Sequence, residues 1–182
     1  MLQDFRKLLD DAVGTTEHVI AIVVDIRGFS NFCSDKESFD VANYIKTVYA
    51  NIIDNFFPET SYLKPTGDGL LIIMKCPTKG LQEFIAEQVK KCLALVQEFP
   101  KIGKENVLIN FETPDKIGIG IARGSACKIS SNSTIIDYSG RLLNMAARLM
   151  DFARPSGVVM HESVGFKLLP PELQQQFLPD SI

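Results

Sequence analysis

An aspartate at the end of an apolar segment is the first residue of this chain with an evident chemical use. Asp25 closes the segment HVIAIVVDI and is followed by a glycine-containing turn. A carboxylate at the end of a strand can bind a metal ion, and the amides of Gly28, Phe29 and Ser30 can then face phosphate oxygens. The simpler alternative is that Asp25 only caps the turn.

A second aspartate lies in a tight turn further along the chain. Asp68 stands between two glycines in the stretch LKPTGDGLLIIM, which predicts a β-hairpin with Asp68 at its tip. If the apolar strands lie side by side, Asp25 and Asp68 meet at one edge of the sheet. Two neighbouring carboxylates repel unless a cation is present, and Mg²⁺ or Mn²⁺ suits such oxygen ligands. An Asp-Gly turn without any ligand is the alternative.

The third candidate is a pair of polar residues on one helix. Asn144 and Arg148 are four residues apart in DYSGRLLNMAARLMD, so they project from the same helical face. Together they can bind a ribose oxygen and a phosphate, because arginine offers a planar set of hydrogen-bond donors. An exposed helix face without a ligand is the alternative interpretation.

These side chains require a framework of strands and helices to position them. In chain order, the apolar patterns predict a strand at 18–26, a helix at 41–57, a hairpin at 61–75, a helix at 80–98, a strand at 116–129, a helix at 138–153 and a strand at 157–160. The polar connection between the second helix and the next strand is expected to carry a short strand at VLINF. Helices interleaved with an antiparallel hairpin predict an α+β sandwich, with a mixed, mostly antiparallel sheet covered mainly on one face.

Length and composition are those of an ordinary globular protein. The 182 residues fit one domain, which we divide into an N-terminal amphipathic helix at 1–14, a core at about 18–161 and a helical tail at 162–182. The net charge of −3 argues against broad nucleic-acid binding, which usually requires a basic face.

The pattern of charges and cysteines indicates a cytoplasmic protein without a membrane partner. Charged residues from the fourth position onward argue against a secretory signal, and the apolar run VIAIVV is too short to cross a bilayer. The four cysteines are widely spaced and form no CxxC pair, which predicts free thiols rather than a zinc site or disulfides.

Together the motifs resemble those of the class III nucleotide cyclase catalytic domain, the family of adenylyl and guanylyl cyclases, over roughly residues 18–161. VVDIRGFSNF resembles the family's strand-end metal motif, LKPTGDGLLIIM its hairpin motif and KIGIGIARG the following glycine-rich strand. DYSGRLLNMAARLMDFARPSGVVM resembles the segment that contacts the base and the transition state. None of these motifs is specific alone, but their order makes the match specific.

The resemblance implies a ferredoxin-like α+β fold that works as a homodimer with shared active sites. It implies that Asp25 and Asp68, together with the carbonyl of Ile26, hold two divalent cations, Mg²⁺ or Mn²⁺. One protomer would supply these metal ligands, and its partner would supply the groups that contact base, ribose and transition state.

The resemblance also assigns residues to the nucleotide. Asn144 would orient the ribose, and Arg148 would stabilise the charge on the α-phosphate. Lys64 and Asp137 fall at the positions that contact the base. A basic residue late in the domain holds the triphosphate in some members, and Arg123, Lys128 and Lys167 are the candidates here.

The implied activity is conversion of a nucleoside triphosphate to its 3′,5′-cyclic monophosphate and pyrophosphate. A lysine donates and an ionised aspartate accepts, which matches the N1 acceptor and exocyclic amine of adenine, so we predict ATP as substrate. Cytosine presents the same pattern, and compact stand-alone members include bacterial pyrimidine cyclases that make cyclic CMP or cyclic UMP against phage. A pyrimidine cyclase is therefore the alternative, and a non-catalytic nucleotide-binding module is a third.

Two departures from the family pattern are visible. The chain has GFS where the family has GFT, a change that keeps the hydroxyl group. The glycine-rich strand continues into SACKISSNSTII, which is longer and more polar than in many members.

Overall fold

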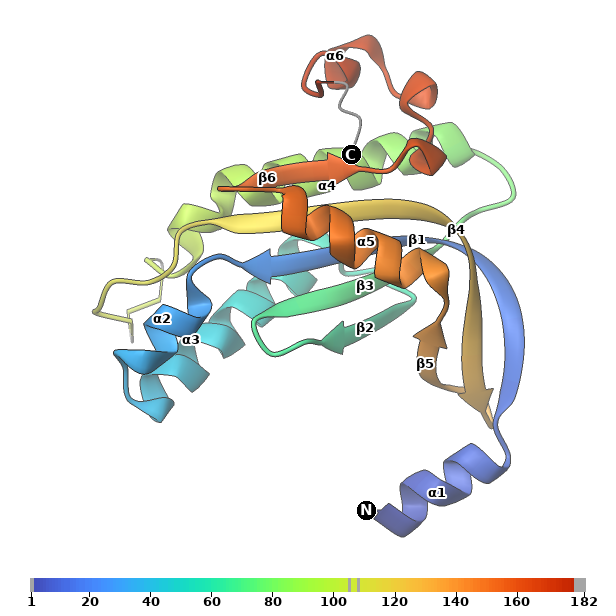
Figure 1. The fold of residues 1–182 in the computed structure, drawn as a ribbon, viewed down its shortest axis with the longest axis horizontal. Helices are drawn as coiled ribbons and strands as arrows, with labels where there is room; N and C mark the ends of the chain where they lie inside the picture. The colour runs from blue at the N-terminus through green and yellow to red at the C-terminus, as the bar shows by residue number, and fades with distance from the viewer. Residues whose placement is uncertain (1, 105, 108, 179–182) are drawn as a thin grey trace.

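A mixed sheet with helices on both faces forms the body of this computed structural model, which describes residues 2–104, 106, 107 and 109–178 (Figure 1). The strands are β1 (Val13–Ile26), β2 (Tyr62–Pro65), β3 (Gly69–Lys75), β4 (Ile117–Ser131), β5 (Thr134–Ser139) and β6 (Gly157–Met160). The α-helices are α1 (Leu2–Asp10), α2 (Phe29–Ser34), α3 (Ser38–Asn51), α4 (Leu81–Ile102), α5 (Arg141–Phe152) and α6 (Pro171–Gln174). Shorter turns are the π-helix η1 (Ile52–Phe56) and the 3₁₀-helices η2 (Glu162–Val164) and η3 (Phe166–Leu168).

The strands follow the order β2-β3-β1-β4-β5, and β6 lies beside β4. Only the β4–β6 pairing is parallel among the described strands, so the prediction of a mixed, mostly antiparallel α+β sheet is confirmed. β1 is central, and its end pairs Asp25 with Gly69 of β3 and with Gly118 of β4. The sheet therefore joins the first predicted motif to the hairpin motif and to the glycine-rich strand.

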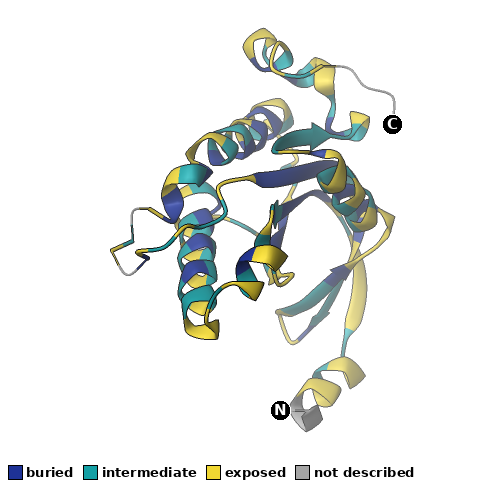
Figure 2. Ribbon diagram, turned by 60° about the vertical axis from the view of Figure 1, so that its left-hand side comes forward, coloured by how far each residue is buried: buried dark blue, intermediate teal, exposed yellow. Residues whose placement is uncertain are grey.

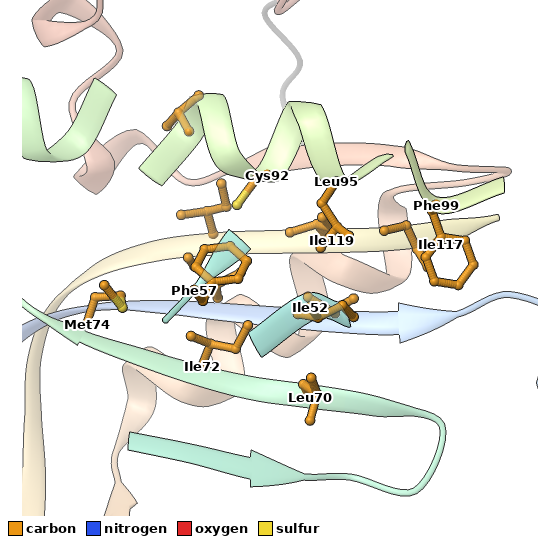
Figure 3. Packing of buried hydrophobic residues seen from close by; sticks show 14 of the residues in the cluster. Ile52, Phe57, Leu70, Ile72, Met74, Cys92, Leu95, Phe99, Ile117 and Ile119 are labelled. Atoms are coloured by element: carbon orange, nitrogen blue, oxygen red, sulfur yellow. The ribbon is translucent and has the colours of Figure 1, made fainter. Parts of the chain in front are cut away.

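The glycine-rich strand β4 places different residues on the two faces of the sheet. Ile117, Ile119 and Ile121 belong to the main core, which α3, α4 and the π-helix close on one side. Figure 3 shows Ile117 and Ile119 beside Leu95 and Phe99 of α4. Gly118 and Gly120 alternate with them and therefore face the other side, where α5 crosses the sheet (Figure 1). A core built from alternating residues of one strand is what a period of two predicts.

The larger core and the helices α3 and α4 lie on one face of the sheet, and α5 in addition covers the second face over β4 and β1. A Cβ atom at Gly120 would collide with the carbonyl of Ala146 and the amide of Met150. The missing side chain at Gly120 thus lets the backbone of α5 approach the strand directly.

The connection before β4 also differs from the prediction. The described residues of VLINF form no strand, and Leu108 lies outside the described residues. Ile109 is buried and Phe111 packs 6.0 Å from the ring of Phe32, whereas Val107 is exposed. The segment buries single side chains in the core instead of pairing its backbone with the sheet. Helix α4 also continues through Pro100 to Ile102, beyond its predicted end.

The first and last described helices lie away from the centre of the sheet (Figure 1). Helix α1 extends from the start of β1, and its apolar residues Phe5 and Leu9 are exposed (Figures 1 and 2). The C-terminal segment follows β6 past α4 and packs through Leu169 and Leu173, while residues 179–182 of the expected tail lie outside the described residues. Within the described part of the chain, no helix combines the length and apolar character needed to span a membrane.

Candidate active site

The structure brings Asp25 and Asp68 to one pocket of about 240 Å³ at the end of β1. Asp25 lies opposite Gly69 in the sheet, and the amide of Ile26 donates to the carbonyl of Asp68 at 2.8 Å. The hairpin tip is therefore fixed against the end of the central strand. Gly28, Phe29 and Ser30, the residues expected to face phosphate, line the same pocket.

The two positions beside Asp68 require glycine for different structural reasons. Gly67 has φ +98°, a conformation that residues with side chains rarely adopt, and its carbonyl accepts a hydrogen bond from the Tyr49 hydroxyl at 2.8 Å. Gly69 has no left-handed φ, but a Cβ atom there would lie 1.9 Å from the carbonyl oxygen of Val24. One glycine makes the turn and the other allows β3 to approach β1 closely.

Arg27 connects Asp25 to the end of α5, and sequence analysis missed this residue. Its guanidinium donates to Asp25 Oδ2 at 2.6 Å, to the carbonyl of Met150, and to the carbonyl of Ala153 at 3.2 Å. A side chain at Gly118 would collide with this guanidinium, so the glycine-rich strand also makes room for Arg27. The contacts join residues more than 120 positions apart, which no local pattern could indicate.

The electrostatics of the pocket favour a cation beside the two aspartates. Burial raises the pKa of the Asp25 carboxyl, the Arg27 guanidinium opposes that rise, and the charge of Asp68 adds to it. A divalent cation would relieve the repulsion between the carboxylates. No group of three or more acidic, cysteine or histidine side chains suited to a metal ion occurs among the residues that the structure describes. The two carboxylates of Asp25 and Asp68 fit Mg²⁺ or Mn²⁺, which use one or two carboxylates and complete their shell with carbonyl, water or phosphate oxygens.

Two further charged residues, Asp151 and Arg154, line this pocket. Asp151 lies in the last turn of α5 and Arg154 follows the helix, so both reach the pocket because α5 crosses the sheet, and their position could not be read from the sequence. Two of the three expected triphosphate candidates are engaged elsewhere: Arg123 donates to the Ser163 carbonyl at 2.7 Å and Lys128 pairs with Glu17 at 2.6 Å. The third, Lys167, lies in η3 and does not line the aspartate pocket. Arg27 and Arg154 are the cationic side chains of the aspartate pocket instead.

Asn144 and Arg148 lie in a second pocket of about 650 Å³. Both side chains are exposed on α5, while Leu142 and Ala146 of the same helix are buried against the sheet. The helical spacing that predicted one polar face and one apolar face is therefore observed. Because Gly120 lets α5 lie close to β4, the position of this polar face is fixed by backbone contact.

Lys64 and Asp137 form an ion pair next to the second pocket. Lys64 Nζ lies 2.6 Å from Asp137 Oδ2, which joins β2 to β5, and Tyr138, the next residue after Asp137, lines the pocket. Burial would raise the pKa of Asp137, but hydrogen bonds from Lys64, the Tyr138 amide and the Tyr62 hydroxyl outweigh it and lower that pKa. Asp137 is therefore an ionised acceptor at neutral pH.

The predicted site residues thus form two groups on one chain. Asp25, Asp68, Ile26 and the α2 turn line one pocket, whereas Asn144 and Arg148 line another, and the two pockets share no lining residue. The pair Lys64 and Asp137 lines neither pocket and adjoins the second one through Tyr138, the residue after Asp137. Neither pocket alone contains both the acidic ligands and the polar face of α5.

The sequence of this chain matches the model of one protein family. The family model described as the adenylate and guanylate cyclase catalytic domain matches residues 12–178. No curated protein sequence matches the chain significantly.

Solved structures with the same fold include cyclases and a cyclase-like protein. The adenylyl cyclase CyaB from P. aeruginosa aligns with TM-score 0.67 and 18% identity, over 86% of this chain and 82% of that chain. The monomeric guanylyl cyclase domain of a fusion protein from the fungus Blastocladiella emersonii aligns with TM-score 0.66 and 15% identity, over 87% of each chain. A class III adenylyl cyclase-like ATP-binding protein from Pseudomonas aeruginosa aligns with TM-score 0.67 and 13% identity, over 89% of this chain and 37% of that chain. At such identities the similarity establishes the fold.

Proposed function

The chain belongs to the adenylate and guanylate cyclase catalytic domain family, and we propose that it converts a nucleoside triphosphate to the 3′,5′-cyclic monophosphate and pyrophosphate. The observation that carries this proposal is the meeting of Asp25 and Asp68 in one pocket, beside the turn at Gly28. Members of the family bind nucleoside triphosphates and generally depend on divalent metals. The proposal adds that this chain retains the activity, because none of the expected acidic, amide or guanidinium groups is missing.

In the proposed reaction the 3′-hydroxyl attacks the α-phosphorus of its own nucleotide and pyrophosphate leaves. Asp25 and Asp68, with the Ile26 carbonyl, would hold two divalent cations, which lower the pKa of the attacking hydroxyl and neutralise phosphate charge when bound. Asn144 orients the ribose by hydrogen bonding. Arg148 places a positive charge where negative charge develops on the α-phosphate, and electrostatic stabilisation of this kind is usually the largest single contribution to catalysis.

We further propose that the active site forms between two copies of the chain. The separation of the aspartate pocket from the Asn144 and Arg148 pocket supports this arrangement, since a partner copy can bring the second group to the first. The family often works as dimers, which is consistent with a shared site. Mixing an Asp25→Ala chain with an Arg148→Ala chain tests the proposal, because one intact composite site should form and restore part of the activity. Well-folded mutants that show no recovery on mixing would contradict it.

The base contacts favour ATP as substrate. Lys64 can donate to N1 of adenine, and Asp137 can accept from the exocyclic amine. The lowered pKa of Asp137 supports its role as an acceptor. The second candidate is a pyrimidine cyclase that makes cyclic CMP or cyclic UMP in bacterial defence against phage. The same observation supports its cyclic CMP form, because cytosine has the same acceptor and amine, whereas uracil carries a carbonyl in place of the amine.

Incubation of the protein with each of the four nucleoside triphosphates and Mn²⁺, followed by chromatographic identification of the products, decides between these candidates. Cyclic AMP as the main product is expected. Cyclic CMP or cyclic UMP as the main product would replace the ATP assignment, and no cyclic product from any nucleotide would refute the cyclase proposal in favour of a nucleotide-binding module.

A further inference from the structure

We propose that Tyr62 is a positioning residue that sets base selectivity by fixing the orientation of the Asp137 carboxylate. This inference rests on the proposed function, in which Asp137 and Lys64 contact the base. Tyr62 is not one of the residues that the resemblance assigns to the nucleotide. Its role follows from its contacts with Asp137, 75 residues further along the chain.

Strand β2 presents two donors to the same carboxylate. Tyr62 and Lys64 are two residues apart in β2, so their side chains project from one face of the strand. The Tyr62 hydroxyl donates to Asp137 Oδ1 at 3.2 Å, and Lys64 donates to Oδ2 at 2.6 Å. The amide of Tyr138 donates to Oδ1 at 2.8 Å. Oδ1 therefore accepts from the Tyr62 hydroxyl and from the β5 backbone, whereas Oδ2 accepts from Lys64.

Oδ1 is bonded to two donors that stay in place, the Tyr138 amide and the Tyr62 hydroxyl. Oδ2 is bonded to the side chain of Lys64, which can move. Lys64 is 47% exposed, so its ammonium group can turn from Oδ2 toward a ring nitrogen when a base enters. Oδ2 is then the acceptor that faces an exocyclic amine. The two donors on Oδ1 restrict rotation of the carboxylate, which keeps Oδ2 in that position.

The Tyr62 hydroxyl is a donor at neutral pH. Burial and the neighbouring Asp137 charge raise its pKa to about 12, so it stays protonated. It also reaches the carbonyl of Ile136 at 3.2 Å, so its single proton is shared between two acceptors of β5. Both contacts hold the same short segment against β2.

The Tyr62 ring is itself held in place by a second tyrosine. Its centroid lies 5.5 Å from the ring of Tyr138, whose hydroxyl donates to Glu17 at 2.6 Å. Glu17 also accepts from Lys128 at 2.6 Å. The Tyr138 hydroxyl therefore supports the ring pair from β1 and β4 without touching the Asp137 carboxylate, which makes it a matched control.

The test compares Tyr62→Phe with Tyr138→Phe, two changes that each remove one buried or half-buried hydroxyl and keep the ring. For each variant, kcat and KM are measured with ATP, CTP, GTP and UTP, and equilibrium binding of the four nucleotides is measured with Mn²⁺. Tyr62→Phe is expected to lower the preference for ATP and CTP over GTP and UTP by about three- to tenfold, the value of one hydrogen bond, mainly through KM. Tyr138→Phe should leave that preference unchanged, and thermal unfolding checks that both chains are folded.

A double variant tests whether Tyr62 acts through Asp137. In an Asp137→Asn chain, Tyr62→Phe should cause no further loss of preference, because the oriented carboxylate is already absent. Equal effects of Tyr62→Phe on all four nucleotides, or the same change of preference in Tyr138→Phe, would overturn the inference. A wild-type chain that prefers GTP or UTP would overturn it too, while leaving cyclase activity intact. A chain without turnover would refute the proposed function, and the binding measurements would still decide the role of Tyr62.

Discussion

Replacement of Gly69 by alanine tests whether the close approach of β3 to β1 builds the aspartate pocket. An added Cβ atom would lie 1.9 Å from the Val24 carbonyl oxygen, whereas real Cβ atoms essentially never come within 3.0 Å of such an atom. Strand β3 must therefore move away from β1 by at least about 1 Å, given these limits. That movement breaks or lengthens the hydrogen bond from the Ile26 amide to the Asp68 carbonyl, which measures 2.8 Å.

The expected cost has a stability part and a metal part. Overpacking of this kind costs about 1–3 kcal/mol, which corresponds to a fall in Tm of about 2–4 °C per kcal/mol for a chain of this size. Displacement of Asp68 from Asp25 should also weaken Mn²⁺ binding by about 10–100-fold, as occurs when the groups that orient metal ligands are removed. Thermal unfolding measures the first effect and titration calorimetry with Mn²⁺ measures the second.

Gly124 provides the matched control. It is also a strand glycine, but a Cβ atom there would lie 3.5 Å from Leu142 Cδ1, an ordinary contact. Gly124→Ala should therefore keep both the Tm and the Mn²⁺ affinity close to wild type. If Gly69→Ala melts and binds Mn²⁺ like Gly124→Ala, the claim that glycine at 69 positions Asp68 is refuted.

Three further outcomes are expected. Arg148→Ala should lower kcat by about 10²–10³-fold without unfolding the chain, because its exposed guanidinium is proposed to stabilise the charge that develops in the transition state. An unchanged kcat in a steady-state assay would show that Arg148 takes no part in the reaction. Arg27→Met should lower the free energy of unfolding, measured in urea, by about 3–5 kcal/mol, because Asp25 loses its buried partner beside Asp68. A variant as stable as wild type would show that the ion pair contributes nothing to stability. Hydrogen bonds from Lys128 and Tyr138 lower the pKa of Glu17, so its contribution to stability is present above its ordinary value of 4.5 and is lost as pH falls through the lowered pKa. Wild type should therefore exceed Glu17→Gln in Tm at pH 7 by more than it does at pH 3, and an equal difference at both pH values would contradict this assignment.

The sequence was most informative where function depends on one strand or one helix. The alternation of isoleucine and glycine in β4, the turn around Asp68 and the four-residue spacing of Asn144 and Arg148 are local patterns, and each predicted the element that the structure contains. The meeting of Asp25 with Asp68 was also predictable, because a hairpin beside the central strand fixes the register within narrow limits.

Contacts between distant segments could not be predicted. The choice of Met150 and Ala153 as acceptors for Arg27 depends on where α5 crosses the sheet, and that crossing depends on the backbone approach at Gly120. The contact of Tyr62 with Asp137 likewise joins the outer strand β2 to β5 at the other end of the strand order. One signal was available for Tyr62, since it lies two residues before Lys64 and must share its face of the strand.

Arg27 links two segments that carry different groups of the proposed site. One guanidinium bonds the Asp25 carboxylate at the end of β1 and the carbonyls of Met150 and Ala153 at the C-terminal end of α5, so it ties these two segments together. Arg148 lies two residues before Met150 on α5, so Arg27 connects the backbone next to Arg148 to the Asp25 carboxylate of the same chain. If two copies share their sites as proposed, each Arg27 connects the aspartate pocket of one site to the helix that supplies Arg148 to the other, so a shift at one site would be coupled to the other.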